Sequence, residues 1–300
     1  MDYVTRPPEK QAEPAQLRSV AEELAAEAAE FVRRRRAEVF GGRAASLSAA
    51  GSGAVRSKTT PTDPVTVVDT ETERLLRDRL AELRPGDPIL GEEGGGPADG
   101  ANGPAGAVTW VLDPIDGTVN FVYGIPAYAV SVGAQIDGVS VAGAVADVVA
   151  GRVYSAAAGL GAHVIDERGT ESLRCAAVDD LSMALLGTGF GYSRRRRASQ
   201  AALVAQLLPV VRDVRRIGSA ALDLCMVAAG RLDAFYEHGL QVWDRAAGAL
   251  IASEAGARVL VTEPDGPSGS AGLVVAAAPG IADELLAALD RFDGLEPLPD

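Results

Sequence analysis

The sequence Asp113-Pro114-Ile115-Asp116-Gly117-Thr118 follows an apolar run, Val108–Leu112, that has the composition of a strand. Its two carboxylates lie three positions apart on a backbone that the proline restrains, and the adjacent glycine lets a ligand approach closely. Open α/β sheets present ligand groups at the ends of their strands. The segment therefore predicts an α/β protein with a site at this strand end, although Asp116-Gly117 alone is also typical of a plain turn.

Three further segments combine acidic residues with strand ends or tight turns: Asp63-Pro64-Val65-Thr66-Val67-Val68-Asp69, Gly91-Glu92-Glu93 and Trp243-Asp244-Arg245-Ala246-Ala247-Gly248. Each has an ordinary alternative, because Asp69 or Asp244 can cap a helix and the glutamates can form a solvated turn. Carboxylate and carbonyl oxygens are also the ligands that suit Mg²⁺. Spacing alone does not show that Glu92 and Asp244, which are far apart in the chain, join one site.

The elements before the central strand begin with an expected mobile arm over residues 1–16. Two amphipathic helices should follow, one from a capping box at Ser19 and Glu22 to about Phe40 and one over Thr70–Leu83. A short strand is expected over Pro88–Leu90. The Gly/Pro-rich loop that ends at Gly106 is a candidate lid.

The elements after the central strand change character near Ser172. Strands at 127–136, 139–149, 152–157 and near His163, separated by hairpin turns, predict an antiparallel meander. Beyond Ser172, strands and helices alternate, which predicts a mostly parallel sheet covered on both faces. We therefore predict an α+β half over residues 17–170 and an α/β half over residues 171–300.

The composition excludes several classes of protein. Among 300 residues, 28 are Lys or Arg and 41 are Asp or Glu, so the net charge of −13 opposes binding to nucleic acid and anionic membranes. The start of the chain, Met1–Lys10, lacks the apolar stretch of a signal peptide. Two cysteines without CxxC spacing and two histidines without an HExxH pattern argue against zinc. We expect a cytoplasmic protein with free thiols.

Two runs of arginine, Arg33–Arg36 and Arg194–Arg197, stand against this acidic background. Nucleic acid or an acidic partner is one interpretation of them. A four-residue charge run is more often a solvated face, and the overall charge favours that interpretation.

The four acidic segments, taken in order, resemble those of the inositol monophosphatases, within the lithium-sensitive, Mg²⁺-dependent phosphatase superfamily. The resemblance extends from about residue 17 to residue 295, and the run Arg215–Leu224 is similar to the bacterial, actinobacterial-type members. It implies a layered αβαβα sandwich, a homodimer and about two to three Mg²⁺ ions per subunit. The implied activity is that of an inositol-phosphate phosphatase, which hydrolyses myo-inositol monophosphate to myo-inositol and phosphate with a metal-activated water.

The same resemblance implies roles for individual residues. Glu92, Asp113 and the carbonyl of Ile115 would hold a first metal ion, and Asp113, Asp116 and Asp244 a second, with Glu92 also near a weaker third. The implied catalytic residues are Asp69, Glu92 and Thr118, of which Asp69 and Thr118 position and help deprotonate the attacking water. Physical chemistry supports the metal independently, because five carboxylates in one pocket would repel each other unless cations neutralised them. Lys58 matches a family lysine near the site.

The resemblance also implies a substrate side, formed by Asp116, Gly117, Thr118, Ser219, Ala220, Glu237 and Asp244. Carboxylates there would accept hydrogen bonds from the hydroxyls of a small phosphorylated polyol. Glu237 is the most specific of these residues, and its ordinary alternative is a surface acid at a strand end.

Two other functions stay open. A metal site of this kind does not recognise the alcohol, so the substrate could be fructose-1,6-bisphosphate, glycerol phosphate, histidinol phosphate or a 3′-phosphonucleotide. The scaffold could also serve a regulatory protein that binds RNA or a transcription component through an arginine run.

Overall fold

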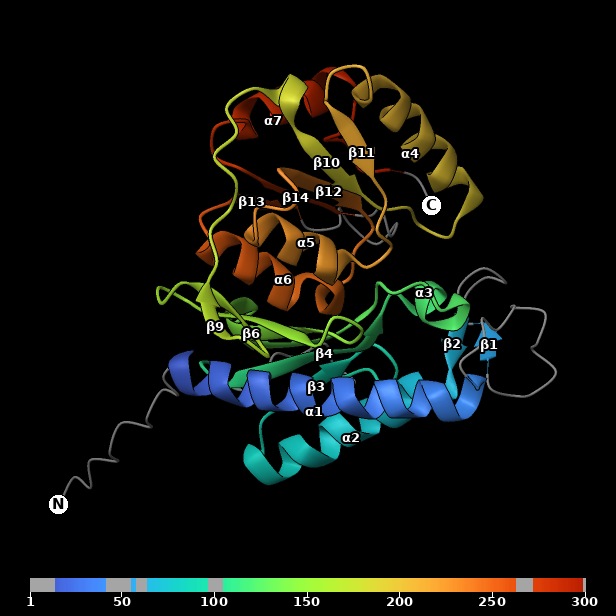
Figure 1. The fold of residues 1–300 in the computed structure, drawn as a ribbon, viewed down its shortest axis with the longest axis vertical. Helices are drawn as coiled ribbons and strands as arrows, with labels where there is room; N and C mark the ends of the chain where they lie inside the picture. The colour runs from blue at the N-terminus through green and yellow to red at the C-terminus, as the bar shows by residue number, and fades with distance from the viewer. Residues whose placement is uncertain (1–13, 42–54, 58–63, 97–104, 263–271, 299–300) are drawn as a thin grey trace, which may run out of the picture.

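The computed structural model describes residues 14–41, 55–57, 64–96, 105–262 and 272–298, and its helices and sheets alternate in layers (Figure 1). A seven-stranded and a five-stranded sheet are separated by one layer of helices and covered on their outer sides by two others. The outer pair on the larger sheet is α1 (Pro14–Phe40) and α2 (Val67–Leu83), the middle pair is α5 (Ala220–Ala228) and α6 (Val242–Glu254), and the remaining pair is α4 (Arg194–Leu207) and α7 (Ala282–Arg291). The αβαβα order expected from the sequence is therefore observed.

Separate clusters of buried apolar side chains fill the interfaces between these layers. Strand β14 (Leu273–Ala277) shows how one strand serves two of them. Its Leu273 and Val275 pack toward α4 and α7, whereas Val274 and Ala276 pack toward the middle helices. A strand covered on both faces must be apolar at every position, which is why this segment shows no polar alternation.

The seven-stranded sheet has the order β3-β4-β5-β6-β7-β8-β9, with all neighbours antiparallel except the parallel pair β3 and β4. Its strands are β3 (Ile89–Gly91), β4 (Val108–Asp116), β5 (Ala129–Ile136), β6 (Val139–Asp147), β7 (Arg152–Ala157), β8 (Ala162–Asp166) and β9 (Gly169–Ser172). The predicted meander is confirmed, and β9 extends it. The register between β4 and β5 shifts between Asp113 and Asp116, so the end of β4 is irregular where the two carboxylates lie.

The five-stranded sheet has the order β11-β10-β12-β14-β13 and is mixed. Its other strands are β10 (Leu185–Thr188), β11 (Asp213–Arg215), β12 (Ala234–His238) and β13 (Arg258–Val261). Strands β11, β10 and β12 are parallel, whereas β14 runs antiparallel to both of its neighbours. The prediction of a mostly parallel sheet holds for β10, β11, β12 and β13, which run in one direction. Strand β14 is the exception, because it follows β13 without an intervening crossover helix among the described residues.

Four short elements complete the described chain: β1 (Val55–Ser57) pairs with β2 (Pro64–Thr66), α3 (Thr118–Tyr123) follows β4, and the 3-10 helix η2 covers Leu181–Met183. No helix in the described ranges has the length and apolar character needed to cross a bilayer.

The start of α1 differs from the prediction. The helix is already formed at Pro14, and Ser19 lies inside it, where its hydroxyl donates to the carbonyl of Ala15 at 3.2 Å instead of capping the helix. Residues 1–13 of the predicted arm, residues 97–104 of the candidate lid, and Lys58 and Asp63 lie outside the described residues. The boundary between the two halves stays a prediction.

The first arginine run holds α1 against its neighbours. The Arg33 guanidinium donates to the carbonyl of Val148, and the Arg36 guanidinium donates to the carbonyl of Phe121 in α3. Arg35 pairs with Glu71 of α2. Three of the four guanidinium groups in this run are therefore used within the fold.

Two glycines let α6 approach the larger sheet closely. Gly133 of β5 and Gly143 of β6 are paired across the strands, and both face α6. A Cβ atom on Gly143 would lie 2.8 Å from the Cβ and 2.9 Å from the Cα of Ala247, and one on Gly133 would lie 3.0 Å from the Cβ of Ala246. The position of α6, and of Asp244 in its first turn, depends on these missing side chains.

Replacing Gly143 with Val should push α6 away from the sheet. Overpacking of this kind costs about 1–3 kcal/mol, so we expect the free energy of unfolding in urea to fall by that amount. Val139→Ala is the matched control on the same strand, because Val139 is 67% exposed and its loss should change stability by less than about 0.5 kcal/mol. Equal effects of the two substitutions would contradict the close packing of α6.

Candidate active site

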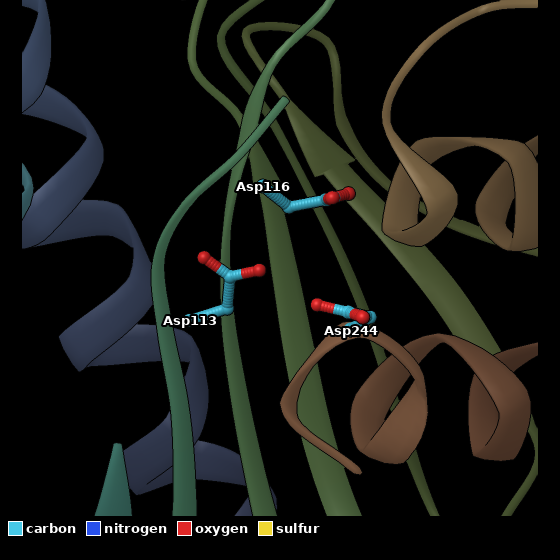
Figure 2. A group of neighbouring side chains, drawn as sticks. All are labelled: Asp113, Asp116 and Asp244. Atoms are coloured by element: carbon cyan, nitrogen blue, oxygen red, sulfur yellow. The ribbon is translucent and has the colours of Figure 1, made fainter. Parts of the chain in front are cut away.

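Three carboxylates from opposite parts of the chain meet at the irregular end of β4 (Figure 2). One oxygen of each of Asp113, Asp116 and Asp244 lies within 4.8 Å of the others. Asp113 and Asp116 are carried by β4, and Asp244 comes from the first turn of α6. The donors are all oxygens, a set that fits a hard cation such as Mg²⁺, so the cluster could hold a metal ion.

The electrostatics of the cluster agree with that fit. Burial raises the pKa of Asp113 well above its ordinary value, and Glu92, Asp116 and Asp244 raise it further by repulsion. Burial is also the main reason that the pKa of Asp116 rises to about 6 and that of Asp244 well above its usual range. Without a cation these carboxyls take up protons more readily than usual, whereas a bound cation would stabilise their charged forms.

Hydrogen bonds from neighbouring backbone and side-chain groups orient Asp116 and Asp244. Asp116 accepts from the hydroxyl of Ser219 at 2.5 Å and from the amide of Ala221 at 2.7 Å. Asp244 accepts from the amide of Gln241 at 2.7 Å, which closes the capping box of α6. These donors lower the pKa of Asp116 and Asp244, so they offset part of the repulsion in the cluster.

Asp69 and Thr118 form a buried pair beside the cluster. Asp69 is fully buried and accepts from the amide of Thr66 at 3.0 Å and from its hydroxyl at 2.5 Å. The Thr118 hydroxyl lies 3.1 Å from Asp69 Oδ1 and 3.0 Å from the carbonyl oxygen of Ile115. Burial raises the pKa of Asp69 to about 7. Asp69 completes the capping box of α2, as its structural interpretation predicts, and it also contacts the pocket-lining Thr118.

Asp69 also explains why α2 begins earlier than expected. The helix starts at Val67 instead of Thr70, because Thr66 is its N-cap and Asp69 completes the capping box. Gly117 has a left-handed backbone with φ of 95°, and a Cβ there would lie 3.0 Å from the carbonyl oxygens of Ala127 and Gly218. Only glycine fits between β4 and α3 at this point.

Glu92 lies in the turn after β3, and a second acid that the sequence analysis missed holds that turn. Glu73 is buried on α2 and accepts from the amide of Glu93 at 2.7 Å and from that of Gly94 at 2.8 Å. Its carboxylate also pairs with Arg77 at 2.8 Å. Glu73 is four positions after Asp69, on the helix face that buries Leu76 and Leu80, and an acid in that apolar stripe was the available signal.

All but one of the predicted site residues line a single pocket with a cavity volume of about 500 Å³. The exception is Asp69, which contacts the pocket-lining Thr118 instead. The predicted residues that do line it are Glu92, Asp113, Ile115, Asp116, Gly117, Thr118, Ser219, Ala220, Glu237 and Asp244. The pocket is also lined by Phe190, Arg196 and Arg216, which the sequence analysis did not assign to the site.

A model of the inositol monophosphatase family matches residues 13–293 of the chain. The chain belongs to the inositol monophosphatase family. It is 78% identical to the inositol-1-monophosphatase of Mycobacterium leprae (strain TN), over 96% of this chain and 98% of that protein. The solved structure of Mycobacterium tuberculosis SuhB has 69% sequence identity and a TM-score of 0.79, covering 95% of this chain and 100% of that one.

A more distant relative carries a different name. The Nus factor SuhB of Pasteurella multocida (strain Pm70) is 38% identical over 75% of this chain and 81% of that protein. Family membership supports a phosphatase that acts on a small phosphate ester. Relatives of this chain thus carry the names of an enzyme and of a Nus factor.

A pocket-lining acid of β12 lies near a second, more deeply buried acid of α5. Glu237 of β12 is half-buried near the end of its strand and lines the pocket. Burial raises the pKa of Glu237 to about 8. Asp223 of α5, which the sequence analysis missed, is 1% exposed, and neither of its carboxyl oxygens has a hydrogen-bond partner among the described residues. Burial and the nearby Glu237 raise its pKa well above the ordinary value.

A serine, a histidine and a glutamate also meet outside the pocket of this inositol monophosphatase family member. The Ser155 hydroxyl and the Glu22 carboxylate both lie near the same His163 nitrogen, Nε2, at 3.0 and 2.9 Å. A nucleophile relay needs the hydroxyl and the acid on opposite ring nitrogens. The cluster therefore joins α1 to β7 and β8 and is not a catalytic triad.

The raised pKa values predict how stability depends on pH in the metal-free protein. An acid whose pKa is raised by folding adds stability below its unfolded pKa, and that stability is lost as the pH rises through the folded value, here about 7 for Asp69. In chelator, urea unfolding should therefore show a lower free energy of unfolding at pH 8 than at pH 5. Mg²⁺ at 100 times its Kd should add about 2.7 kcal/mol at pH 8.

Asp69→Asn is the control for this prediction, because it removes one titrating carboxyl and should flatten the pH dependence in chelator. The prediction would be contradicted if, in chelator, the free energy of unfolding rose from pH 5 to pH 8 by the same amount in the unaltered protein and in the Asp69→Asn variant.

Proposed function

We propose that this protein is a Mg²⁺-dependent phosphatase that hydrolyses myo-inositol monophosphate to myo-inositol and phosphate. The observation that carries the proposal is the meeting of Asp113, Asp116 and Asp244 beside the Asp69–Thr118 pair. An oxygen-rich cluster that needs a cation, next to a buried acid that titrates near neutral pH, suits hydrolysis of a phosphate ester by water.

The residues that would hold metal are Glu92, Asp113, Asp116, Asp244 and the carbonyl of Ile115, all of which line the pocket. Mg²⁺ held there would polarise the phosphate and lower the pKa of a bound water. Two observations support these roles: Glu73 holds the turn that carries Glu92, and Asp116 accepts hydrogen bonds from Ser219 and Ala221.

The proton of the attacking water has a path within the protein. Thr118 Oγ1 lines the pocket and lies 3.1 Å from Asp69 Oδ1, so a proton released in the pocket can be taken up by this pair. With a pKa of about 7, Asp69 can accept that proton near neutral pH. The new bond forms between the water oxygen and phosphorus while the bond from phosphorus to the alcohol oxygen breaks, and the alcohol oxygen takes up a proton.

The alcohol is proposed to contact the substrate-side wall. Ser219, Ala220 and Glu237 line the pocket, and so does Gly117, which precedes α3. Glu237 can hydrogen-bond to ring hydroxyls, which supports inositol over an alcohol that carries no hydroxyl besides the phosphorylated one.

Further properties belong to the same proposal: two to three Mg²⁺ ions per subunit, inhibition by lithium, a homodimer and a cytoplasmic location. They rest on the family to which the chain belongs. A transcription-associated role is a second candidate, and the printed name of the Pasteurella multocida relative supports it. Salt-dependent RNA binding that persists in an Asp113→Asn variant would favour that role.

Asp113→Asn should lower kcat for inositol 1-phosphate by about 100-fold or more, because the most buried carboxylate of the cluster is lost. Phosphate release with saturating Mg²⁺ is the measurement, and chelator should abolish the activity of the unaltered protein. Asp78→Asn, at a carboxylate that is 71% exposed on α2, should leave kcat unchanged. A near-normal rate for the Asp113 variant, or full turnover of the unaltered protein in chelator, would contradict the proposal.

Glu237→Ala should weaken the use of inositol 1-phosphate and spare an aryl phosphate, which has no ring hydroxyls. Loss of a hydrogen bond worth about 1–2 kcal/mol corresponds to a drop in kcat/KM of roughly 5–30-fold. Glu237→Gln keeps the shape and a hydrogen-bonding group, so it should retain more activity than the alanine variant. Equal losses on both substrates would mean that Glu237 supports the fold and does not contact the alcohol.

A further inference from the structure

The Glu237 carboxylate rests on a glycine of the neighbouring strand. Strands β10 and β12 are parallel, and their register pairs Thr188 with Tyr236, so Gly189, directly after β10, comes beside Glu237. The three atoms nearest to a Cβ on Gly189 would all belong to that carboxylate: Cδ, Oε1 and Oε2 of Glu237, each close enough to overlap with it. The carboxylate therefore occupies the space that a side chain at residue 189 would need.

Space and not hydrogen bonding holds this carboxylate in position. Within the described ranges, no hydrogen bond or ion pair is found for the Glu237 side chain. Asp116, in contrast, accepts hydrogen bonds from Ser219 and Ala221. Because its oxygens are not used by the protein, Glu237 keeps its capacity to hydrogen-bond the hydroxyls of a ligand in the pocket that it lines.

The backbone at residue 189 does not explain why a glycine stands there. The glycines with positive φ include Gly117 and Gly218, both at 95°, but not Gly189. A residue with a side chain can therefore adopt the backbone of Gly189. A glycine at a strand also marks a place where another group approaches closely, and here that group is the Glu237 carboxylate.

A second glycine of the same wall faces a different side chain. Gly189 and Gly191 flank Phe190, and both line the pocket. Gly191 has no positive φ either, but the three atoms nearest to a Cβ there would all belong to Arg196, the first of them Cδ at 2.9 Å. The two glycines therefore differ in which side chain a methyl group would displace, and only Gly189 is matched to the acid of β12.

We propose that Gly189 is a positioning residue for Glu237 and thereby determines substrate specificity: the space left by its missing side chain fixes where the pocket offers hydrogen-bonding oxygens to the hydroxyls of a polyol. A methyl group at residue 189 must move the carboxylate away from this position, because the atoms that it would meet first are the movable end of the Glu237 side chain. The inference rests on the proposed phosphatase function and deepens it by naming a residue that selects polyol phosphates through Glu237.

The test compares kcat/KM for inositol 1-phosphate and for p-nitrophenyl phosphate at saturating Mg²⁺, because the ratio of the two values cancels any general loss of folded enzyme. Gly189→Ala should lower the ratio of inositol 1-phosphate to aryl phosphate by about 5–30-fold, the change expected for Glu237→Ala. In the Glu237→Ala background the carboxylate is absent, so adding Gly189→Ala should change the ratio by less than about 2-fold. A merely structural role of Gly189 would lower both substrates, and equally in both backgrounds.

Gly191→Ala is the matched control, and its ratio should equal that of the unaltered protein. An unchanged ratio in Gly189→Ala, or the same change with and without Glu237, overturns the inference while the phosphatase function stands. If only the Gly189→Ala/Glu237→Ala double variant folds, the clash with the carboxylate is supported; if neither variant folds, the methyl group meets something else and the inference is overturned. If the unaltered protein releases phosphate from neither substrate, the proposed function fails first.

Discussion

Repulsion among buried carboxylates is the constraint that the rest of this structure must satisfy. Asp113, Asp116 and Asp244 approach within 4.8 Å while burial raises the pKa of each. Side chains on flexible loops would separate under that repulsion. Here two come from a strand inside a seven-stranded sheet and one from a helix packed on that sheet through two glycines. The packing of α6 on the sheet therefore determines whether the site exists.

The helices contribute more than rigid support. Asp69 and Asp244 each complete a capping box, so the backbone amides that a helix leaves unpaired at its start become donors to the carboxylates. The partial positive charge at a helix N-terminus also offsets part of the cost of burying negative charge. A helix cap and a site residue are thus the same feature at these two positions, and the fold gains local order from the groups that the proposed chemistry needs.

Local patterns were enough to predict most elements and the four acidic segments, because strand and turn composition is a property of neighbouring residues. Long-range features were less accessible. The antiparallel direction of β14 depends on its pairing with β12 and β13, and the meeting of Asp244 with Asp113 depends on the stacking of both sheets on α6. No spacing in the chain encodes either.

Single charged residues within apolar stretches were the other class that the sequence analysis missed. Glu73 and Asp223 each look like one polar position in an amphipathic helix, and only the structure shows that both are buried. The prediction of a helix start at Ser19 and Glu22 was wrong for a different reason. They match a capping box, but the helix begins at Pro14, the first described residue, so the same residue types serve inside it. Two residues that match a capping motif are therefore weak evidence of where a helix begins.

The pocket divides its tasks between the two sheets. The acidic cluster is carried mainly by β4 and by α6 packed on the larger sheet, whereas Glu237 belongs to β12 and Arg216 follows β11 directly. A metal site polarises any phosphate, so selection of the alcohol must come from the other wall. The bond from Ser219 to Asp116 joins the two sides at 2.5 Å. Substitutions in the five-stranded half can therefore change which alcohol is bound while the acidic cluster keeps its geometry. Such a division agrees with the different names of the relatives, one an enzyme and one a Nus factor.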